Sequence, residues 1–384
     1  MKGNTKLRQD NIKRIFCEIR DRGPISKREL QELTEFSWGS ISTITTELEE
    51  SGYIMSAGKQ KGAVGRRPEE YDINITDNFI IGIDLSRVGF IAAVTDLRGR
   101  VVREYRQTFS LETTDTAIKK LFDTLDGVLK ELDGFKVWGI AVAVQGAVRD
   151  ERISVAVNGI SGWKNVPLAD IIEEKFGINT VLIHDPDCII RTEKYFGKLK
   201  NPDIKNAFLL RVDHGIGMSI MTERNPYVGC DGKSGEIGYN VVPRADGAGF
   251  VRLDSLMTEG SLIKNYCMKT GFSDGITCTQ IAERARGGEA AARELFEEIG
   301  TALGFALTNA VNLLYPETVV IYGTFSAFAD LYIKTAQRVL NENVYDTSVG
   351  ITVSDLSYDA AAVGAALCAG ERVVTMLNFG TEKE

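Results

Sequence analysis

The 384-residue sequence has few of the side chains from which metal sites and disulfide frameworks are built. It contains only two histidines, and its six cysteines are spread from Cys17 to Cys368 without a C-x-x-C pair. Structural zinc sites and small disulfide-stapled domains both need such residues at short, regular spacing. The sequence therefore argues against a cysteine- or histidine-based metal site and favours reduced thiols.

Long apolar runs are also missing. No stretch of about 18 consecutive apolar residues occurs, and the N-terminal segment lacks the apolar core of a signal peptide. We therefore expect a cytoplasmic protein with no membrane partner. With 43% hydrophobic and 26% charged residues, the composition is that of an ordinary globular chain, long enough for two or three domains.

Acidic residues outnumber basic ones except at the N-terminal end. The chain has a net charge of −8, yet residues 1–68 carry 13 Lys and Arg against 9 Asp and Glu. A local excess of basic side chains favours contact with DNA phosphates. The asymmetry is modest, and alone it does not distinguish a DNA-binding end from an incidental excess.

Residues typical of helix starts and ends indicate the fold of the N-terminal segment. Residues 11–22 show apolar helical spacing and end at Gly23-Pro24. Ser26 followed by Glu29 is a capping-box pattern that opens a second helix, and Ser37 caps a third helix ending near Gly52. Two short helices at this spacing, after a supporting helix, predict a helix-turn-helix.

The segment after these helices predicts a wing. β-prone residues 53–55 and 71–75 flank a loop with glycine and lysine, so residues 1–76 are expected to form a winged helix-turn-helix DNA-binding domain. In the third helix, the polar positions expected to face DNA are Trp38, Ser40, Ser42, Thr43 and Thr46. No Arg or Lys lies in that helix, so Arg66 and Arg67 of the wing are expected to contact phosphates or the minor groove. The alternative is that this basic segment is a solvated linker.

Residues 77–384 alternate between apolar strand-like runs and amphipathic helices, which is typical of an α/β body. Three early strands precede the first helix. Expected strands cover residues 80–85, 89–95, 101–109, 137–144, 180–183, 207–212 and 318–322. Expected helices cover residues 115–132, 168–176, 290–314, 327–340 and 360–374, with a loop and short helix within 271–287.

Three motifs in this body resemble the ROK family, whose name stands for repressors, open reading frames and sugar kinases. They are N-G-I-S-G-W-K-N-V-P-L at 158–168, V-L-I-H-D at 181–185 and G-E-I-G at 235–238. Their order and approximate spacing match the family. The resemblance implies an actin-like, sugar-kinase-like body of two α/β lobes, and the helix-turn-helix with G-R-R-P at 65–68 resembles the family's repressor branch.

The resemblance also implies a sugar site. Asn158, Asp185 and Glu236 match family positions that bind sugar hydroxyls, and carboxylates and amides suit hydroxyl-rich ligands. In the family's kinases, the aspartate matching Asp185 also acts as general base. Without the resemblance, Asp185 with Pro186 would be interpreted as a turn and Glu236 as a surface charge. Tyr239 stands where the family has a histidine, and it could hydrogen-bond a sugar, stack on it or fill space.

The elements that bind nucleotide in the family are altered. Residues 84–88 read D-L-S-R-V in place of D-x-G-G-T, and residues 213–217 read D-H-G-I-G in place of G-T-G-x-G. The later glycine pair is Gly323-Thr324. Lost glycines hinder close backbone approach to phosphates, and the carboxylate of Asp213 would repel them. We therefore expect no ATP turnover and no enzyme activity, with Asp185 a vestigial base.

The family's zinc motif, C-x-C-G-x-x-G-C, is absent from the segment that starts at Arg244, so neither zinc nor any other cofactor is expected. The leading hypothesis is a sugar-responsive repressor of carbohydrate metabolism, a homodimer or homotetramer that binds a palindromic operator. Two alternatives remain. One is an ATP-dependent sugar kinase with a vestigial helix-turn-helix, and the other is a DNA-binding repressor that responds to no ligand.

Overall fold

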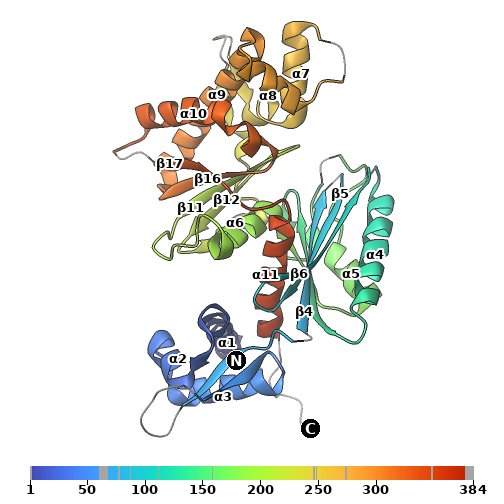
Figure 1. Ribbon diagram of the computed structural model, residues 1–384, viewed down its shortest axis with the longest axis vertical. Helices are drawn as coiled ribbons and strands as arrows, with labels where there is room; N and C mark the ends of the chain where they lie inside the picture. Colours follow the sequence, from blue (N-terminus) through green and yellow to red (C-terminus); the bar gives the residue numbers. More distant parts are fainter. Residues whose placement is uncertain are drawn as a thin grey trace. The chain divides into compact units, whose positions relative to one another are not determined.

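The structure is a computed structural model in which the chain forms two compact units. Unit 1 comprises Met1–Ile183 with Ala361–Glu384, and unit 2 comprises His184–Ala360 (Figure 1). The model describes every residue except 1, 60–67, 77, 87, 111, 158, 245, 246, 248, 273, 274, 347, 348 and 377–384. Among the described residues, no helix has the length and apolar character needed to cross a lipid bilayer.

Unit 1 begins with the predicted winged helix-turn-helix. Its helices are α1 (Lys2–Arg22), α2 (Lys27–Thr34) and α3 (Trp38–Glu50), and its sheet has the order β1 (Ile25–Ser26), β3 (Glu69–Ile73), β2 (Ile54–Lys59). All strand pairs in this sheet are antiparallel. The prediction of the module is confirmed, although α1 begins at Lys2 rather than residue 11, and the short strand β1 was not predicted.

The predicted capping residues begin the two helices of the motif. Glu29 N–H donates to Ser26 Oγ over 3.3 Å, and the Glu29 carboxylate accepts from Ser26 N–H over 2.9 Å, which completes a capping box. Ser37 Oγ accepts from Ser40 N–H at the start of α3. These bonds satisfy N–H groups that have no partner within a helix, so they fix where α2 and α3 begin.

We expect Ser26→Ala to lower the free energy of unfolding of unit 1 by about 1 kcal/mol, the usual effect of losing such a cap. Hydrogen bonds from the Ser26 side chain, and then from its backbone, lower the pKa of Glu29 below its ordinary value of 4.5. The contribution of the Glu29 carboxylate to stability is therefore complete above pH 4.5, and it is lost as the pH falls through the lowered pKa.

This expectation can be measured by urea unfolding followed by tryptophan fluorescence, because Trp38, Trp138 and Trp163, the chain's three tryptophans, all lie in unit 1. The stability difference between the native protein and Ser26→Ala should shrink as the pH falls below the ordinary glutamate value of 4.5. Exposed Ser110, replaced with alanine, serves as the control. A difference of similar size for both variants would contradict the capping role.

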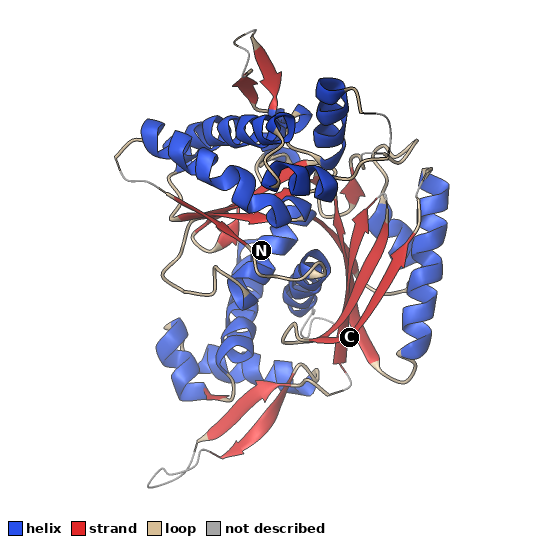
Figure 2. Ribbon diagram, turned by 45° about the horizontal axis from the view of Figure 1, so that its top comes forward, coloured by secondary structure: helices blue, strands red, loops and turns tan. Residues whose placement is uncertain are grey.

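The lobe in unit 1 is a five-stranded sheet with helices on both faces (Figures 1 and 2). The sheet order is β10 (Thr180–His184), β7 (Lys136–Val144), β4 (Asn78–Ser86), β5 (Gly89–Asp96), β6 (Val101–Thr108), with helices α4 (Thr114–Glu131), α5 (Leu168–Phe176) and α11 (Ala360–Met376), and a hairpin of β8 (Val148–Arg149) and β9 (Ile153–Ser154). Alternate residues of β4, Ile81 and Ile83, pack in one core with α4 and α5. Gly82, which points the other way, lies against the backbone of α11 at Ala362.

Unit 2 has a second five-stranded sheet. Its order is β13 (Asn225–Pro226), β12 (Ile216–Thr222), β11 (Ala207–Val212), β16 (Thr318–Tyr322), β17 (Gly350–Val353), and β14 (Val241–Pro243) pairs with β15 (Phe250–Arg252). Its helices are α6 (Asp185–Phe196), α7 (Glu259–Thr270), α8 (Cys278–Arg286), α9 (Ala290–Leu314) and α10 (Ala329–Asn343), with short 3-10 turns η1 (Cys230–Gly232), η2 (Ile237–Tyr239), η3 (Leu253–Ser255) and η4 (Thr324–Phe328). Phe296 and Leu303 of α9 pack with Ile321 of β16 in its core.

The two α/β lobes expected from the sequence are present, but two elements beside the candidate site differ. Asp185 and Pro186 do not form an isolated turn; they are the first residues of α6, a helix that the sequence did not predict. Strand β12 was also not predicted, and it pairs antiparallel with β11 from Ile216↔Val212 to Met221↔Ala207. Proline is tolerated in the first turn of a helix because its missing N–H has no helical partner there.

Within unit 1, the winged module is attached to the lobe by a buried ion pair. Arg20 at the end of α1 is 4% exposed, and its guanidinium lies 3.3 Å from the carboxylate of Glu371 in α11, which is 5% exposed. Lys13 lies 3.0 Å from the same carboxylate, and Asp21 lies 2.9 Å from Arg20. Helices α1 and α11 are thus joined by a buried Arg20–Glu371 pair, flanked by the more exposed Lys13 and Asp21.

Two further contacts complete this attachment. Arg98 of the lobe donates to the carbonyl of Arg20 over 2.9 Å and pairs with the Asp72 carboxylate in β3. Tyr53, which is fully buried, lies with its ring centroid 4.0 Å from that of Trp138 in β7. Module and lobe are therefore packed as parts of one unit.

Candidate functional site

The candidate ligand site in unit 2 is centred on Asp185. This residue is 4% exposed and lies in the first turn of α6, where unpaired backbone N–H groups favour a carboxylate. Its Oδ2 accepts a hydrogen bond from Arg211 Nη1 over 2.9 Å, and its Oδ1 lies 3.7 Å from His184 Nε2. The sequence-predicted sugar residue is thus a buried carboxylate held by an arginine.

The same arginine binds a second carboxylate. Arg211 Nε donates to Asp213 Oδ2 over 2.8 Å, and the other oxygen of Asp213 accepts from the backbone N–H of Thr324 over 2.6 Å and from its hydroxyl over 3.0 Å. Gly323 allows this approach, because its φ is 101° and a Cβ there would lie 2.5 Å from Asp213 Oδ1. Arg211 therefore links α6, strand β11 and the loop after β16.

Asp213 is held as a charged group. Burial raises the pKa of its carboxyl, but the positive charge of Arg211 and the hydrogen bonds from Arg211 and Thr324 outweigh burial, so the pKa lies below its ordinary value. Beside it, His214 Nδ1 lies 2.9 Å from Glu259 Oε2. That hydrogen bond is the main reason why the pKa of Glu259 is also lowered.

Glu236 and Tyr239 lie on the segment that packs along the start of β12. Gly235, with a φ of 83°, lies so close to that strand that a Cβ would be 1.7 Å from the Met218 carbonyl oxygen. On β12, a Cβ on Gly217 would lie 2.9 Å from Pro186 at the start of α6. The start of β12 therefore lies against both the segment carrying Glu236 and the helix carrying Asp185.

Glu236 is exposed, and Tyr239 is 60% exposed. The guanidinium of Arg252 lies over the Tyr239 ring, 3.8 Å from its centroid, and also pairs with Asp254. Tyr239 does not fill a core position, because most of its side chain is exposed. The third predicted sugar residue, Asn158, lies outside the described residues.

Arg211 was not identified as a site residue from the sequence. Its signal was a charged side chain near the end of an otherwise apolar strand, A-F-L-L-R-V in β11. Buried charges are rare unless they are paired, so such a residue points to a carboxylate partner. The sequence did not reveal that the partner is Asp185.

Helix α3 presents the polar face predicted to meet DNA. Trp38 is 54% exposed, and Thr43 and Thr46 are also exposed, whereas Ser40 and Ser42 are half-buried. Ile41, Ile44 and Leu48 lie in the core of the module, as their helical spacing predicted. The wing residues Arg66 and Arg67 lie outside the described residues.

Comparison with known proteins identifies both parts of the chain. A model of the ROK family matches residues 80–372, more than half of the sequence. The chain belongs to the ROK family. A model described as "Winged helix-turn-helix DNA-binding" matches residues 8–55, within the module that precedes the ROK body.

Relatives of this ROK protein align over almost its whole length. The xylose repressor of Caldicellulosiruptor bescii is 26% identical, and the alignment covers 99% of each chain. The DNA-binding transcriptional dual regulator NagC of Escherichia coli K12 is 26% identical over 94% of this chain and 93% of its own. A solved ROK family transcriptional regulator, a homologue of the E. coli MLC protein, is 21% identical with a TM-score of 0.82, covering 96% of this chain and 97% of that one.

In the part of the ROK body that the structure describes, no group of three or more His, Cys, Asp and Glu side chains is arranged to hold a metal ion. The altered zinc segment falls partly on undescribed residues, and the expected lack of zinc and ATP stays a prediction. Tyr239 stands at the position of the histidine expected in the zinc motif, and its ring faces the Arg252 guanidinium. A phenol ring is a poor substitute for an imidazole ligand of zinc.

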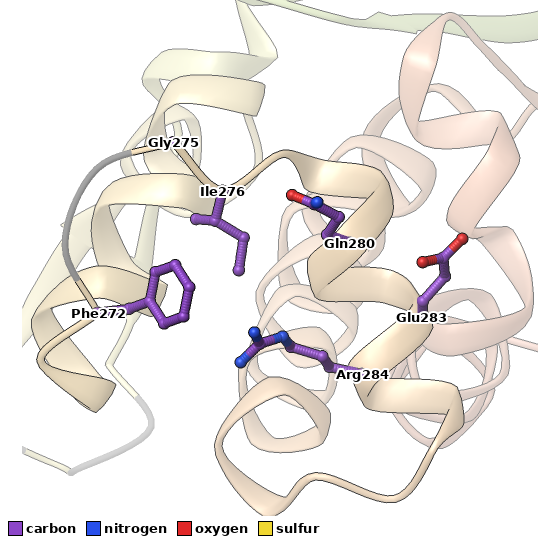
Figure 3. Close-up of a pocket in the computed structure, with 6 residues that line it drawn as sticks. All are labelled: Phe272, Gly275, Ile276, Gln280, Glu283 and Arg284. Carbon is purple, nitrogen blue, oxygen red and sulfur yellow. The ribbon is translucent and has the colours of Figure 1, made fainter.

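A hollow of about 620 Å³ elsewhere in unit 2 is lined by the loop that follows α7 and by α8 (Figure 3). Phe272 and Arg284 point toward each other across it, with the guanidinium 4.8 Å from the ring centroid. Arg284 also donates to the hydroxyl of Tyr266 over 2.8 Å. The lining residues are Phe272, Gly275, Ile276, Gln280, Glu283 and Arg284. None of them belongs to the Asp185 network, so the hollow is separate from the candidate site.

Proposed function

We propose that this ROK protein is a transcriptional repressor that binds operator DNA through α3 and releases it when a sugar binds at Asp185. The observation that carries the proposal is a winged helix-turn-helix with a polar, exposed face on α3, packed onto the ROK body by a buried ion pair. A DNA-reading module attached in this way follows the state of the body to which it is joined. The xylose repressor and the transcriptional regulator NagC, which align with almost the whole chain, support the same function.

The ligand proposed for the site is a sugar because Asp185 and Glu236 offer acceptors for hydroxyl groups. Tyr239 adds an exposed aromatic ring, whose apolar face suits a sugar ring and whose hydroxyl can hydrogen-bond to it. We further propose that Asn158 contributes an amide to the same ligand. The wing arginines, Arg66 and Arg67, would support α3 by contacting phosphates.

We propose that the body binds without catalysing phosphoryl transfer. A general base must accept the proton of the reacting hydroxyl, and one oxygen of Asp185 already accepts a hydrogen bond from the Arg211 guanidinium. The expected independence from ATP and zinc belongs to this proposal. So does a cytoplasmic homodimer or homotetramer, whose symmetry would match a palindromic operator.

The test is to select bound fragments from the host genome with the purified full chain and to repeat the binding at one fixed salt concentration with a panel of sugars. Salt must be fixed because phosphate contacts make DNA affinity strongly salt-dependent. Specific fragments that one sugar releases would support the proposal. Fragments that no sugar releases would leave a ligand-independent repressor, and the absence of specific fragments would overturn DNA recognition.

Replacing Trp38 with alanine is expected to weaken operator binding about tenfold, because a groove-facing side chain contributes about 1–3 kcal/mol. The indole is 54% exposed, so the stability of the module should change little. Fluorescence anisotropy with a labelled operator fragment measures the affinity. Thr43→Ala and Thr46→Ala should act in the same direction with smaller effects.

Tyr345→Ala is the matched control, since it removes an aromatic side chain that is 80% exposed but lies in unit 2. It should leave operator affinity unchanged. If Trp38→Ala and Tyr345→Ala bound the operator equally well, α3 would not be the helix that reads DNA.

A further inference from the structure

We propose that the effector of this site is an uncharged, unphosphorylated sugar, because the protein's own Asp213 and Arg211 occupy the position where an anionic group would otherwise be held. The inference deepens the proposed function and depends on it for the assignment of Asp185 as a sugar residue. It is carried by three sets of contacts within unit 2.

The first set is an anion-binding arrangement that is already filled. The backbone N–H and the hydroxyl of Thr324 converge on one oxygen of Asp213, at 2.6 Å and 3.0 Å. Gly323 brings the backbone close enough for these bonds because it has no Cβ. Backbone N–H groups next to a glycine with positive φ commonly bind phosphate oxygens. Here they bind a carboxylate of the same chain.

The second set consists of the two bonds that Arg211 makes to carboxylates of this chain, although a bound phosphate would need the same arginine. Arg211 is 13% exposed, and it bonds to Asp185 through Nη1 and to Asp213 through Nε. Arginine usually binds phosphate through two N–H groups at once. Turning Arg211 toward a phosphate would leave buried Asp185 and partly buried Asp213 without their shared counter-charge, which is strongly unfavourable.

The third set is the pairing of the neighbouring cationic side chains with carboxylates. His214 lies against Glu259, and Arg252, whose guanidinium lies over the Tyr239 ring, pairs with Asp254. A phosphate ester that approached His214 or Arg252 would therefore also meet a carboxylate. Like charges in a partly buried site repel strongly. A neutral sugar avoids this repulsion, and its hydroxyls can donate to Asp185 alongside Arg211, since a carboxylate accepts several hydrogen bonds.

The inference is tested with matched pairs of ligands on the full chain. The probes are xylose with xylose 1-phosphate, glucose with glucose 6-phosphate, and N-acetylglucosamine with its 6-phosphate. Operator release is followed at fixed salt, and binding is followed by calorimetry. For the sugar that acts, the free form should be effective at a concentration at least about 100-fold lower than its phosphate ester, a difference of about 2.7 kcal/mol. An ester that acts as well as or better than its free sugar would overturn the inference.

A second measurement does not depend on finding the sugar. Wild-type protein should show no calorimetric binding of inorganic phosphate at millimolar concentration, whereas Asp213→Ser should gain it, because the variant removes the carboxylate that accepts from Thr324 and from Arg211 Nε. Asp254→Ser, which removes the carboxylate paired with exposed Arg252, is the control and should gain none. Equal phosphate binding by wild type and Asp213→Ser would overturn the assignment of Asp213 as the internal occupant. If the wild-type protein bound no operator, or if no sugar released it, the proposed function would fail instead.

Discussion

Replacing Glu371 with glutamine is expected to destabilise unit 1 by about 3 kcal/mol, because it leaves the Arg20 guanidinium buried without its buried counter-charge. Asp21 stays within 2.9 Å of Arg20, but its side chain is 41% exposed, so it compensates only in part. A second variant, Arg20→Met with Glu371→Leu, replaces the pair with apolar side chains. It should recover most of the lost stability, since such exchanges are often neutral or stabilising.

The measurement is urea unfolding followed by tryptophan fluorescence, which reports unit 1 alone. Glu32→Gln is the control, because its partner Arg28 and Glu32 itself are largely exposed at the surface of α2. That change should alter the free energy of unfolding by no more than about 0.5 kcal/mol. An equally small effect of Glu371→Gln would show that the buried pair does not hold the module to the lobe.

Asp185→Asn is expected to raise the sugar concentration needed for half-maximal operator release by about 100-fold. The reason is that two hydrogen bonds from sugar hydroxyls to a carboxylate each become bonds to a neutral amide, and bonds to charged groups contribute about 1.5–3 kcal/mol each. Asparagine keeps the shape of the side chain and an oxygen that accepts from Arg211. The loss therefore reports the charge of Asp185 rather than a collapse of the network.

Release is measured by anisotropy of a labelled operator fragment, with each protein normalised to its own affinity for DNA without sugar. Asp203→Asn, which changes an exposed aspartate in the same unit, is the control and should keep the native sugar response. A normal response of Asp185→Asn would remove this residue from the ligand site. Steady ADP production with a hexose would instead support a kinase.

The parts of the fold that the sequence predicted well are those with long or strongly apolar patterns. Helices α5 and α9 and strand β16 have the predicted bounds, because their apolar faces repeat at the helical period or form a short buried run. Helix α6 was missed because its first residues, Asp185 and Pro186, resemble a turn. Both residues are also favourable in the first turn of a helix, so the dipeptide is compatible with either a turn or a helix start.

The sequence pointed to some residues of the candidate site but not to the contacts between them. Family motifs located Asp185, Glu236 and Tyr239, and the altered phosphate loop drew attention to Asp213. The bond between Arg211 and Asp185 joins residues 26 positions apart, and it depends on how α6 packs beside β11. Such packing has no local sequence pattern. For the same reason, the pairing of Arg20 with Glu371, 351 positions apart, could not be inferred from the sequence.

The attachment of the winged module has a consequence for recombination between ROK proteins. Tyr53, Asp72 and Arg20 of the module have their partners, Trp138, Arg98 and Glu371, scattered over the rest of unit 1. A module transplanted alone onto another ROK body would place Arg20 and Tyr53 against a surface that lacks partners equivalent to Glu371 and Trp138. New pairings of operator and effector should therefore arise more readily by substitution on the exposed face of α3 than by exchange of whole modules, which makes the chain, rather than the domain, the unit that is inherited.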